Sequence, residues 1–348
     1  LTYISRAPVE EYHNTKEYIG FQPADRIENT QKFEALLPSL AEKSVAFHES
    51  ALADEPKQLA AVIEMATRVW RRPLSTAEQD ELQRLYDLLH HDQNLSHNAA
   101  IRTVVMRIFA SPKFLYRVEC PTSDEETLAL SDWELASRLS YFLWSTVPDE
   151  ALRAAAAAGR LQDQEALIAH SRRMLQDSKA RALAIEFAGQ WLQFRGFDQY
   201  NGKSETRFPM FTPQMRAAMS QETTEFMTEI IRSDRSVLEI LKADYTFVND
   251  ELARHYNIPD IQGPEFRRVD GVNRFGRGGI ISMGTVLTKQ SGALRTSPVL
   301  RGTWIVETLL GREIPNPPDD VPPLAEDEVN KGGLTVRQLV ERHRADAS

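Results

Sequence analysis

Apolar residues along most of the chain recur with the 3.6-residue period of an amphipathic helix. In LSTAEQDELQRLYDLLHH, Ser75 stands three residues before Glu78, which is the spacing of a capping box, and a stripe of leucines follows. The same order recurs in LSDWELASRLSYFLW, where Ser131 and Glu134 form the box. Both segments predict a helix that begins directly after its serine.

Other helix starts and stops follow similar rules. Pro148 opens a helix that Gly159 ends, and Thr212 with Pro213 opens a longer one. Helices separated mostly by short connections are also predicted over residues 57–70, 97–110, 163–176, 179–195, 213–233 and 248–257. The sequence therefore predicts a helical array up to about residue 257.

The pattern changes after His255. The segment NIPDIQGPEFRRVDGVNRFGRGGIISMGTVLT is rich in Gly, Pro and β-branched residues and lacks a helical period, which favours short strands or irregular loops. A helix that starts at Ser297 and stops near Gly311 follows. Thr335 and Gln338 then have the capping-box spacing of a last helix.

These patterns predict a mostly α protein, a multi-helix array or bundle with a short irregular or β-containing Gly-rich segment near 258–295. The predicted domains are an unassigned N-terminal segment 1–56, a helical domain 57–257 divisible into 57–125 and 126–257, a Gly-rich segment plus helix 258–314, a Pro-rich linker 315–333, and the start of a C-terminal module 334–348.

Composition narrows the function classes. The formal charge of −9 argues against a nucleic-acid-binding surface, and no stretch approaches the roughly 18 apolar residues of a membrane span. Cys120 is the single cysteine, so the chain holds no internal disulfide, Cys-rich zinc site or CxxCH haem attachment. The start, LTYISRAPVEEYHN, has neither a signal-peptide pattern nor an initiator methionine, and we expect a segment of a larger or processed polypeptide.

A particular order of phrases runs through the chain. The phrases are WRRPLSTAEQDELQRLY (70–86), FASPKFLYRVE (109–119), LSDWELASRLSYFLWSTVPDEAL (130–152), FAGQWL (187–192), ADYTFVNDELARHYNI (243–258), RFGRGGIISMGTVLT (274–288) and RTSPVLRGTWIVETLLG (295–311). In this order they resemble the uncharacterised helical domains of the large planctomycete-type proteins that carry c-type cytochrome modules. The resemblance covers roughly residues 57–348.

The resemblance implies a periplasmic or otherwise extracytoplasmic protein whose c-type haem lies in adjacent modules, with no cofactor inside this chain. The final phrase, GLTVRQLVERHRADAS, resembles the lead-in to a C-terminal CxxCH motif. The implied partners are the adjacent cytochrome-like modules or a redox partner protein. By resemblance the chain supports redox chemistry or electron transfer.

The segment LTKQSGALRTSPVLRGTW, residues 287–304, is the main candidate site. Ser297 suits a helix N-cap and Pro298 suits the first helical position, which explains both residues without any ligand. Arg295 and Arg301 add fork-shaped donors beside this helix start, so an anion contact or a domain contact is the alternative. A haem propionate, a substrate carboxylate or a sulfate would suit such a contact.

The preceding loop FGRGGI contains Gly276, Gly278 and Gly279, which allow a close approach of backbone or positive φ angles. It matches neither nucleotide-binding fingerprint, and a tight turn or bulge explains it without a ligand. Arg277 within this loop joins the anion or domain contact candidates. The loop and the Arg-Ser-Pro helix are close in sequence, so one shared recess is a hypothesis.

Other candidate residues favour structural interpretations. Glu222, Glu225 and Glu229 form a helical row that is interpreted as a solvated acidic face, and no metal ligands are assigned. No metal or catalytic set is assigned to the remaining histidines and their acidic neighbours. These are Glu10-x-x-His13, Glu251 with His255, His48, and His90-His91. The tryptophans in apolar helical patterns are interpreted as core anchors: Trp70, Trp133, Trp144, Trp191 and Trp304.

Two alternatives to the redox hypothesis stay open. The first is a non-catalytic binding or assembly scaffold within a larger multidomain complex, because no compact catalytic motif is present. The second is a hydrolase that uses carboxylates such as Glu222 and Glu225. The sequence assigns no catalytic residue and leaves open whether the chain is an enzyme.

Overall fold

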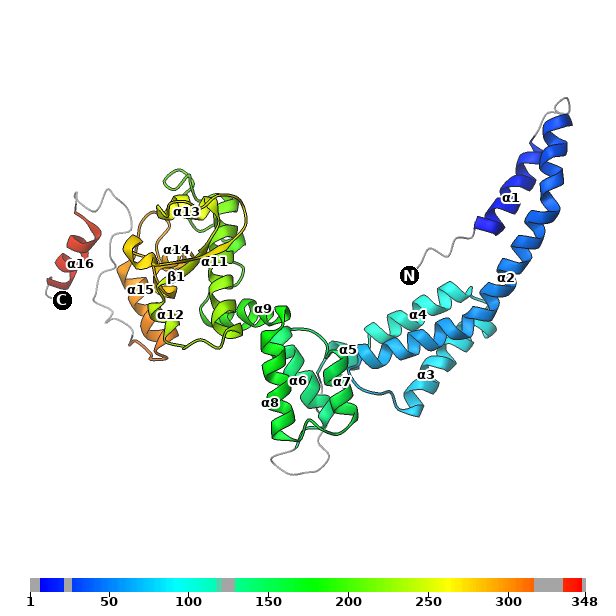
Figure 1. Ribbon diagram of the computed structural model, residues 1–348, viewed down its shortest axis with the longest axis horizontal. Coiled ribbons are helices and arrows are strands. Elements are labelled where there is room, and N and C mark those ends of the chain that lie inside the picture. Colours follow the sequence, from blue (N-terminus) through cyan, green and yellow to red (C-terminus); the bar gives the residue numbers. More distant parts are fainter. Residues whose placement is uncertain (1–6, 22–26, 118, 120–128, 316–333, 346–348) are drawn as a thin grey trace. The chain divides into compact units, whose positions relative to one another are not determined.

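The computed structural model describes residues 7–21, 27–117, 119, 129–315 and 334–345. The chain forms two compact units, unit 1 over Leu1–Ala129 and unit 2 over Leu130–Ser348 (Figure 1). Helices dominate both units and the described strands make one two-stranded sheet, so the prediction of a mostly α fold is confirmed. Cys120 and most of the Pro-rich segment, residues 316–333, lie outside the described residues.

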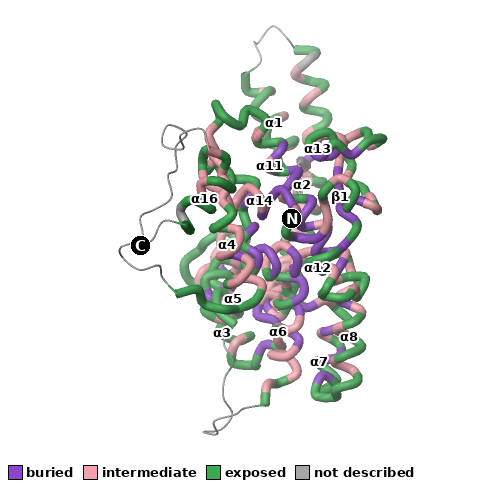
Figure 2. Tube along the Cα trace, turned by 90° about the vertical axis from the view of Figure 1, so that its left-hand side faces the viewer, coloured by how far each residue is buried: buried purple, intermediate pink, exposed green. Residues whose placement is uncertain are grey.

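Unit 1 is built from helices alone among its described residues. They are α1 Ala7–Gly20, α2 Ile27–Val69, α3 Thr76–Asp87, the π-helix η1 Leu88–Asp92, α4 His97–Phe109 and α5 Pro112–Leu115. The capping box predicted for α3 is confirmed, because the Ser75 hydroxyl accepts from Glu78 N–H while the Glu78 carboxylate accepts from Ser75 N–H. Figure 2 shows that α1 is mostly exposed.

The predicted start of a helix at residue 57 is wrong, because α2 begins at Ile27 and runs for 43 residues. Pro38 and Pro56 both lie inside it. A proline usually marks the first turn of a helix because it has no N–H to donate, so Pro56 resembles a helix start. The helix continues through it because its C-terminal half packs against α3 and α4.

The core of unit 1 lies where α2, α3 and α4 meet. Trp70, Leu82, Val104 and Ile108 are buried there, and the Trp70 indole N–H donates to the Ile108 carbonyl at 3.1 Å. Burying an apolar side chain of this size contributes about 1.5–3 kcal/mol. These contacts join three successive helices of the chain.

Unit 2 has more elements and several buried clusters. Its first helices are α6 Asp132–Trp144, α7 Glu150–Ala157, α8 Gln164–Gln176, η2 Ser178–Ala180, α9 Arg181–Leu183, η3 Ala184–Ala188, α10 Gly189–Trp191 and η4 Phe197–Gln199. The remaining elements are α11 Pro213–Arg232, α12 Glu239–Lys242, β1 Tyr245–Val248, α13 Asp250–Tyr256, β2 Arg267–Asp270, η5 Val272–Phe275, η6 Ile280–Ser282, α14 Gly284–Lys289, α15 Pro298–Trp304, η7 Ile305–Leu309 and α16 Val336–Ala345.

The predicted helix ends of unit 2 are confirmed where a local signal specifies them. Ser131 and Glu134 make the capping box of α6, and Thr212 caps α11 by accepting from Met215 N–H at 3.1 Å. Gly159 follows α7 with φ of +65°, a value that glycine adopts without strain. The Thr335 and Gln338 box precedes α16 as predicted.

Helix α11 is the centre of unit 2, and its buried residues face two apolar clusters. Phe226 and Ile230 pack with Tyr245 of β1 in one cluster, while Met215 and Met219 belong to the other. Figure 2 shows this burial along α11. The helix therefore carries the packing that positions β1, α13 and α14 around it.

The strands differ from those expected after residue 258. Among the described residues beyond 258, only β2 is a strand, and it pairs antiparallel with β1, in the register Tyr245↔Asp270 to Val248↔Arg267. The first strand precedes α13, in a region assigned to the helical array. Its four residues are too few for a period to be recognised, so the distant partner decides its conformation.

Candidate functional site

The segment around Ser297 is a helix start, as predicted. Ser297 Oγ accepts a hydrogen bond from Leu300 N–H at 3.2 Å, and Pro298 takes the first helical position of α15. An antiparallel bridge between Ser291 and Thr296 closes the turn that precedes this helix. The bridge brings the backbone of Ser291 next to that of Thr296.

Lys203 holds this turn from a distant part of the chain. Its ammonium donates to the carbonyls of Ser291 and Gly292, each at 2.7 Å, and to Ser291 Oγ at 2.9 Å. The neighbouring Ser204 N–H donates to the Ala293 carbonyl at 3.1 Å. Sequence reasoning did not single out Lys203, because it lies in an unpatterned loop far from the turn it contacts.

Lys203 and Arg301 form a pair of like charges, called the cationic pair below. Burial and the Arg301 charge lower the pKa of Lys203 to about 8, and burial also lowers the pKa of Arg301. The Arg301 guanidinium donates to Thr296 Oγ1 at 2.5 Å, and its Nε is buried without a hydrogen bond. Across the described residues, neither side chain has a carboxylate within 4.0 Å. An anion at this position would relieve their repulsion.

The other basic residues of this segment donate to backbone carbonyls. The Arg295 guanidinium donates to the Thr296 carbonyl at 3.3 Å, so Arg295 and Arg301 both contact Thr296. Lys289 donates to the Gln193 carbonyl at 2.6 Å, and burial lowers its pKa. The role of Arg295, Ser297 and Arg301 in an anion or domain contact stays a prediction.

The glycine-rich loop packs against the backbone around the end of α12. A Cβ on Gly278 would lie 2.6 Å from the Ala243 carbonyl oxygen, and one on Gly279 would lie 2.4 Å from that of Leu241. Gly276, with φ of +70°, has open space around it. The close approach of backbone therefore involves α12 and the residue that directly follows it.

Arg277 takes part in a different cluster from Arg301. Its guanidinium lies 3.6 Å from the centre of the Tyr256 ring and donates to the Ser282 carbonyl at 2.7 Å. The described hydrogen bonds and ring contacts of Arg277 thus involve α13 and η6, whereas those of Arg301 involve the 291–301 turn. The two parts of the predicted recess have separate surroundings.

The interpretation of the α11 glutamates as a solvated row is wrong for Glu222, which is 1% exposed. Its carboxylate accepts from Thr246 Oγ1 at 2.6 Å and from the Tyr256 hydroxyl at 2.7 Å, and that hydroxyl accepts from Gly284 N–H at 3.0 Å. Burial raises the pKa of Glu222 to about 7. The three glutamates recur at helical spacing, but this spacing does not reveal which face of α11 is buried.

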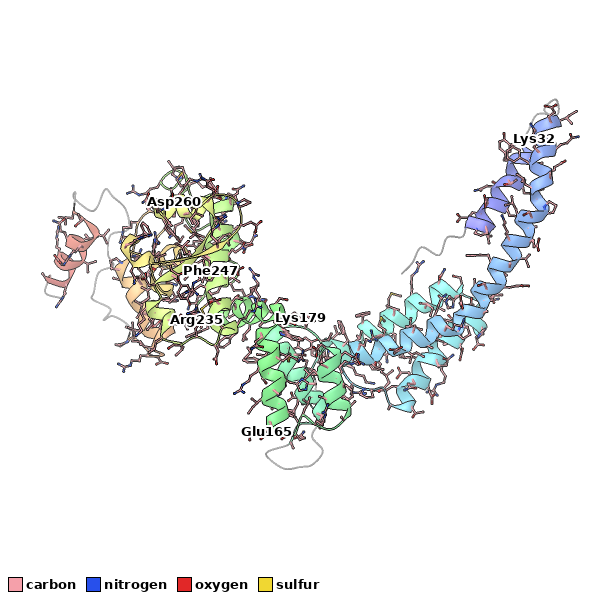
Figure 3. All side chains as sticks on the ribbon, viewed as in Figure 1. Lys32, Glu165, Lys179, Arg235, Phe247 and Asp260 are labelled. Atoms are coloured by element: carbon pink, nitrogen blue, oxygen red, sulfur yellow. The ribbon has the colours of Figure 1, made fainter. Side chains whose placement is uncertain are left out.

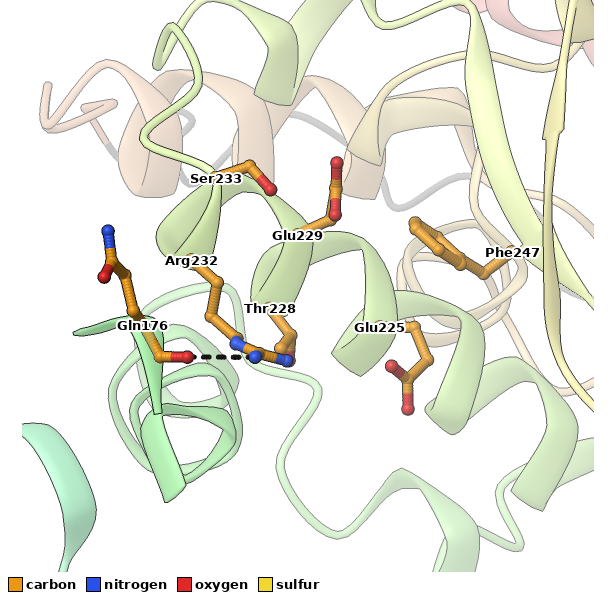
Figure 4. Close-up of a pocket in the computed structure, with 7 residues that line it drawn as sticks. All are labelled: Gln176, Glu225, Thr228, Glu229, Arg232, Ser233 and Phe247. Carbon is orange, nitrogen blue, oxygen red and sulfur yellow. Dashed lines mark hydrogen bonds between the residues drawn. The ribbon is translucent and has the colours of Figure 1, made fainter. Parts of the chain in front are cut away.

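The remaining two glutamates line a pocket of about 410 Å³ near the C-terminal half of α11 (Figure 4). The other lining residues are Gln176, Thr228, Arg232, Ser233 and Phe247. Figure 3 labels Phe247, which β1 supplies, and Arg235, which follows α11. The pocket is polar, and Glu222 does not line it.

The carboxylates of this pocket are ion-paired with arginines. Arg181 Nε donates to Glu225 at 3.3 Å, while Arg235 and Arg268 both donate to Glu229, at 2.9 and 3.0 Å. A pair of carboxylates poised for acid and base chemistry needs different environments and a shared substrate position. Glu222 and Glu225 do not meet that requirement, because one is enclosed in the core and the other is ion-paired at the pocket.

The tryptophans differ in how far they are buried. Trp70, Trp144 and Trp304 are buried, but Trp191 is 37% exposed, so its interpretation as a core anchor is wrong. Its indole N–H donates to the Thr308 carbonyl at 3.0 Å. In the described part of the chain, no group of three or more His, Cys, Asp or Glu side chains is placed to hold a metal ion.

These features define a helical protein with a cationic pair at a turn and no assigned catalytic group. Three of its segments match family models: residues 59–119 match PSD5, protein of unknown function (DUF1595); residues 130–258 match PSD4, protein of unknown function (DUF1592); and residues 277–348 match PSCyt3, protein of unknown function (DUF1588). Their names suggest planctomycete-type cytochrome-associated proteins. No curated protein and no solved structure matches the chain.

No helix among the described residues is long and apolar enough to cross a membrane.

Proposed function

We propose that the chain is an extracytoplasmic module of a c-type-cytochrome-associated protein and supports redox chemistry or electron transfer, with the haem held outside this chain. The observation that carries the proposal is the ordered set of three family matches, which includes PSCyt3 at residues 277–348. A c-type haem in this proposal is attached outside the chain, because a CxxCH attachment needs two cysteines and the chain has one.

The cationic pair is the contact point of this proposal. Arg301 lies within the segment 277–348 that matches PSCyt3, and Lys203 lies elsewhere in unit 2. Lys203 and Arg301 are partly buried and lack a carboxylate partner among the described residues, and the chain as a whole is acidic. Partly buried cations attract an anion more strongly than fully solvated ones, because screening by water is weaker. The group that fits is a haem propionate or a carboxylate of the adjacent cytochrome-like module.

The haem supplies the electron-transfer chemistry when it is bound in its own module. In this proposal the residues of the present chain orient that module. Arg301 is suited to a bidentate contact with a carboxylate, because its guanidinium offers donors in a fixed plane. Lys203 fixes the turn that presents Arg301.

The test uses the full-length protein. Covalent-haem staining and an optical spectrum are expected to show c-type haem, and its absence from the intact protein would refute the proposal. The double variant Lys203→Ala and Arg301→Ala is expected to change the haem midpoint potential or the salt dependence of reduction. Arg254→Ala is the matched control, because Arg254 is an exposed cation paired with Asp250.

The scaffold function is the second candidate, and an exposed aromatic cluster favours it. Phe142, Phe187 and Trp191 are 60%, 52% and 37% exposed. The Phe142 and Phe187 ring centres lie 6.3 Å apart, and those of Phe187 and Trp191 lie 6.1 Å apart. Contiguous exposed aromatic rings are typical of protein contact surfaces.

The same full-length protein separates the two functions. If the double variant of the cationic pair and Phe187→Ser both weaken association between modules and leave the haem potential unchanged, the scaffold function is supported. A changed potential in the double variant alone supports the redox function.

A further inference from the structure

The polar pocket beside α11 is built from three elements of unit 2 (Figure 4). Gln176 lies at the end of α8 and Phe247 lies in β1, while the other lining residues belong to the C-terminal part of α11 and the serine after it. The volume of about 410 Å³ falls within the range of small-molecule pockets, about 300–1,000 Å³. Neither Lys203 nor Arg301 lines it, so a ligand here is independent of the cationic pair.

The charges in and around the pocket balance. The carboxylates are Glu225, Glu229, Glu239 and Asp270, and the guanidiniums are Arg181, Arg232, Arg235 and Arg268. An anionic ligand would be repelled by the two glutamates of the lining. A cationic ligand would have to compete with arginines that already pair with these glutamates. The pocket therefore favours a neutral ligand.

The ion pairs hold the two lining glutamates in place and leave acceptors for a ligand. Arg181 donates to Glu225 Oε1, while Arg235 and Arg268 both donate to Glu229 Oε1. Among the described residues, no hydrogen bond reaches Oε2 of either glutamate. A carboxylate accepts through both of its oxygens, so each Oε2 can take a hydroxyl hydrogen of a ligand.

Other lining residues add donors. Within the described part of the chain, the Gln176 side-chain amide and the Ser233 hydroxyl make no hydrogen bond to protein. Thr228 Oγ1 donates to the Thr224 carbonyl at 2.6 Å, and its lone pairs remain as acceptors. A ligand hydroxyl both donates and accepts, so it matches a lining that offers both kinds of group.

Phe247 supplies an aromatic ring to the same pocket. It is partly buried against the cluster that contains Tyr245, and the two ring centres lie 6.2 Å apart. The face of an aromatic ring is electrostatically negative and attracts polarised C–H groups. A pyranose carries such C–H groups on its faces and hydroxyls around its edge. The aromatic ring and the polar groups together therefore match a sugar.

We propose that this pocket binds a neutral sugar unit. Glu225 and Glu229 accept from its hydroxyls, Gln176 and Ser233 donate to its oxygens, and the Phe247 ring contacts its C–H face. Both glutamates accept from arginines, whereas glycoside hydrolysis needs a carboxylic acid that donates a proton. The proposed activity is therefore binding.

Saturation-transfer difference NMR on the full chain tests the proposal. The probes are glucose, galactose, mannose and N-acetylglucosamine, each as the free sugar and as its methyl glycoside. We expect transfer to at least one of them, strongest at C–H protons of one ring face. Binding of a methyl glycoside indicates a unit of a glycan, and binding of the free sugar alone indicates a monosaccharide. Absence of transfer to every probe would overturn the proposal.

Two variants locate the bound sugar. Gln176→Ala removes an exposed amide and Phe247→Leu removes the ring while keeping an apolar side chain, so each should weaken the best probe about fivefold. Gln164→Ala is the first control, because Gln164 is an exposed glutamine at the other end of α8. Phe275→Leu is the second, because Phe275 is partly buried against a different cluster. Unchanged affinity in both pocket variants would contradict the assignment.

A measurement on the wild type keeps the proposal testable if a variant fails to fold. At pH 6 glucosamine is a cation and glucuronate is an anion, and both share the ring of glucose. Each should bind at least about fivefold more weakly than the best neutral probe, because the charges of the pocket already balance. Tighter binding of either charged sugar would refute a neutral sugar as the ligand.

Discussion

The Tyr256 hydroxyl donates a 2.7 Å hydrogen bond to the Glu222 carboxylate in a region of unit 2 where Glu222 is 1% exposed. Tyr256 lies on α13 and Glu222 on α11, so one hydrogen bond joins the central helix to the element after β1. The carboxylate keeps these partners in either charge state, but its charged form lacks the water that stabilises it elsewhere. This relationship makes the stability of unit 2 sensitive to pH.

Glu222→Gln is expected to change the pH dependence of stability. Burial raises the pKa of Glu222 to about 7, so between pH 4.5 and 7 the folded state binds more protons than the unfolded state. The stability from this group is present below pH 4.5 and is lost as the pH rises through 7. The neutral variant should therefore be more stable than the wild type at pH 8, by about 1–3 kcal/mol, with little difference at pH 5.

Urea unfolding of unit 2 at the two pH values measures this effect. Glu265→Gln is the control, because Glu265 is exposed, and it should change neither value. Glu222→Ala should destabilise at both values, since Thr246 and Tyr256 lose an acceptor. A wild-type advantage over Glu222→Gln at pH 8 would contradict this account.

Alanine substitutions in the glycine-rich loop should differ in cost. Gly278→Ala and Gly279→Ala place a Cβ within 2.6 Å of a backbone carbonyl oxygen, at φ values of +141° and +64°, so each should destabilise by at least about 2 kcal/mol. Gly276→Ala has the same type of φ and open space, and it should cost about 1 kcal/mol. Chemical denaturation compares the three, and equal losses would show that the close approach to the Leu241 and Ala243 carbonyls is unimportant.

The cationic pair predicts stabilisation by a multivalent anion. Burial and Arg301 hold the pKa of Lys203 at about 8, so the folded state binds fewer protons than the unfolded state between pH 8 and 10.5, and this penalty fades as the pH rises. An anion at the pair offsets the penalty at neutral pH. Sulfate should raise the unfolding midpoint of the wild type by about 2–4 °C more than sodium chloride at equal ionic strength.

Differential scanning calorimetry measures this shift. Lys203→Ala combined with Arg301→Ala should abolish the sulfate-specific part, while Arg254→Ala should retain it. A sulfate effect of equal size in the double variant would locate the anion elsewhere.

Glu78 should stabilise unit 1 at neutral pH and lose this effect in acid, which is the opposite of the pH dependence expected for Glu222. A hydrogen bond from Arg72, with help from Lys113 and the Ser75 N–H, holds the pKa of Glu78 well below its usual range, although burial opposes the shift. This stability is present above pH 4.5 and is lost as the pH falls toward the lowered pKa. Glu78→Gln should therefore cost about 1–2 kcal/mol at pH 7 and clearly less at pH 2.

Circular dichroism during guanidinium unfolding checks this prediction at both pH values. Glu64→Gln is the control, since the Glu64 carboxylate is exposed and pairs with the exposed Arg68. A loss in Glu78→Gln that is the same at pH 2 and pH 7 would show that the ion pair with Arg72 is not its cause.

Helix starts were predictable from sequence because an N-cap is a local device. Ser75, Ser131 and Ser297 each accept from a backbone N–H three residues ahead, and that geometry needs no distant partner. The mostly α class followed from the same local patterns. The start of α2 was missed for the same reason, since Pro56 has a strong local meaning that packing against α3 and α4 overrides.

The surroundings of the charged residues required the tertiary structure. The helical period placed Glu222 on one face of α11, but only Thr246, Tyr256 and Gly284 from later segments make that face an enclosed carboxylate site. Arg301 was selected from sequence, whereas Lys203 became its neighbour through the 291–301 turn. Hydrogen bonding within one helical turn is determined by neighbouring residues in the sequence, but burial and the coupling of charges depend on which distant segments meet.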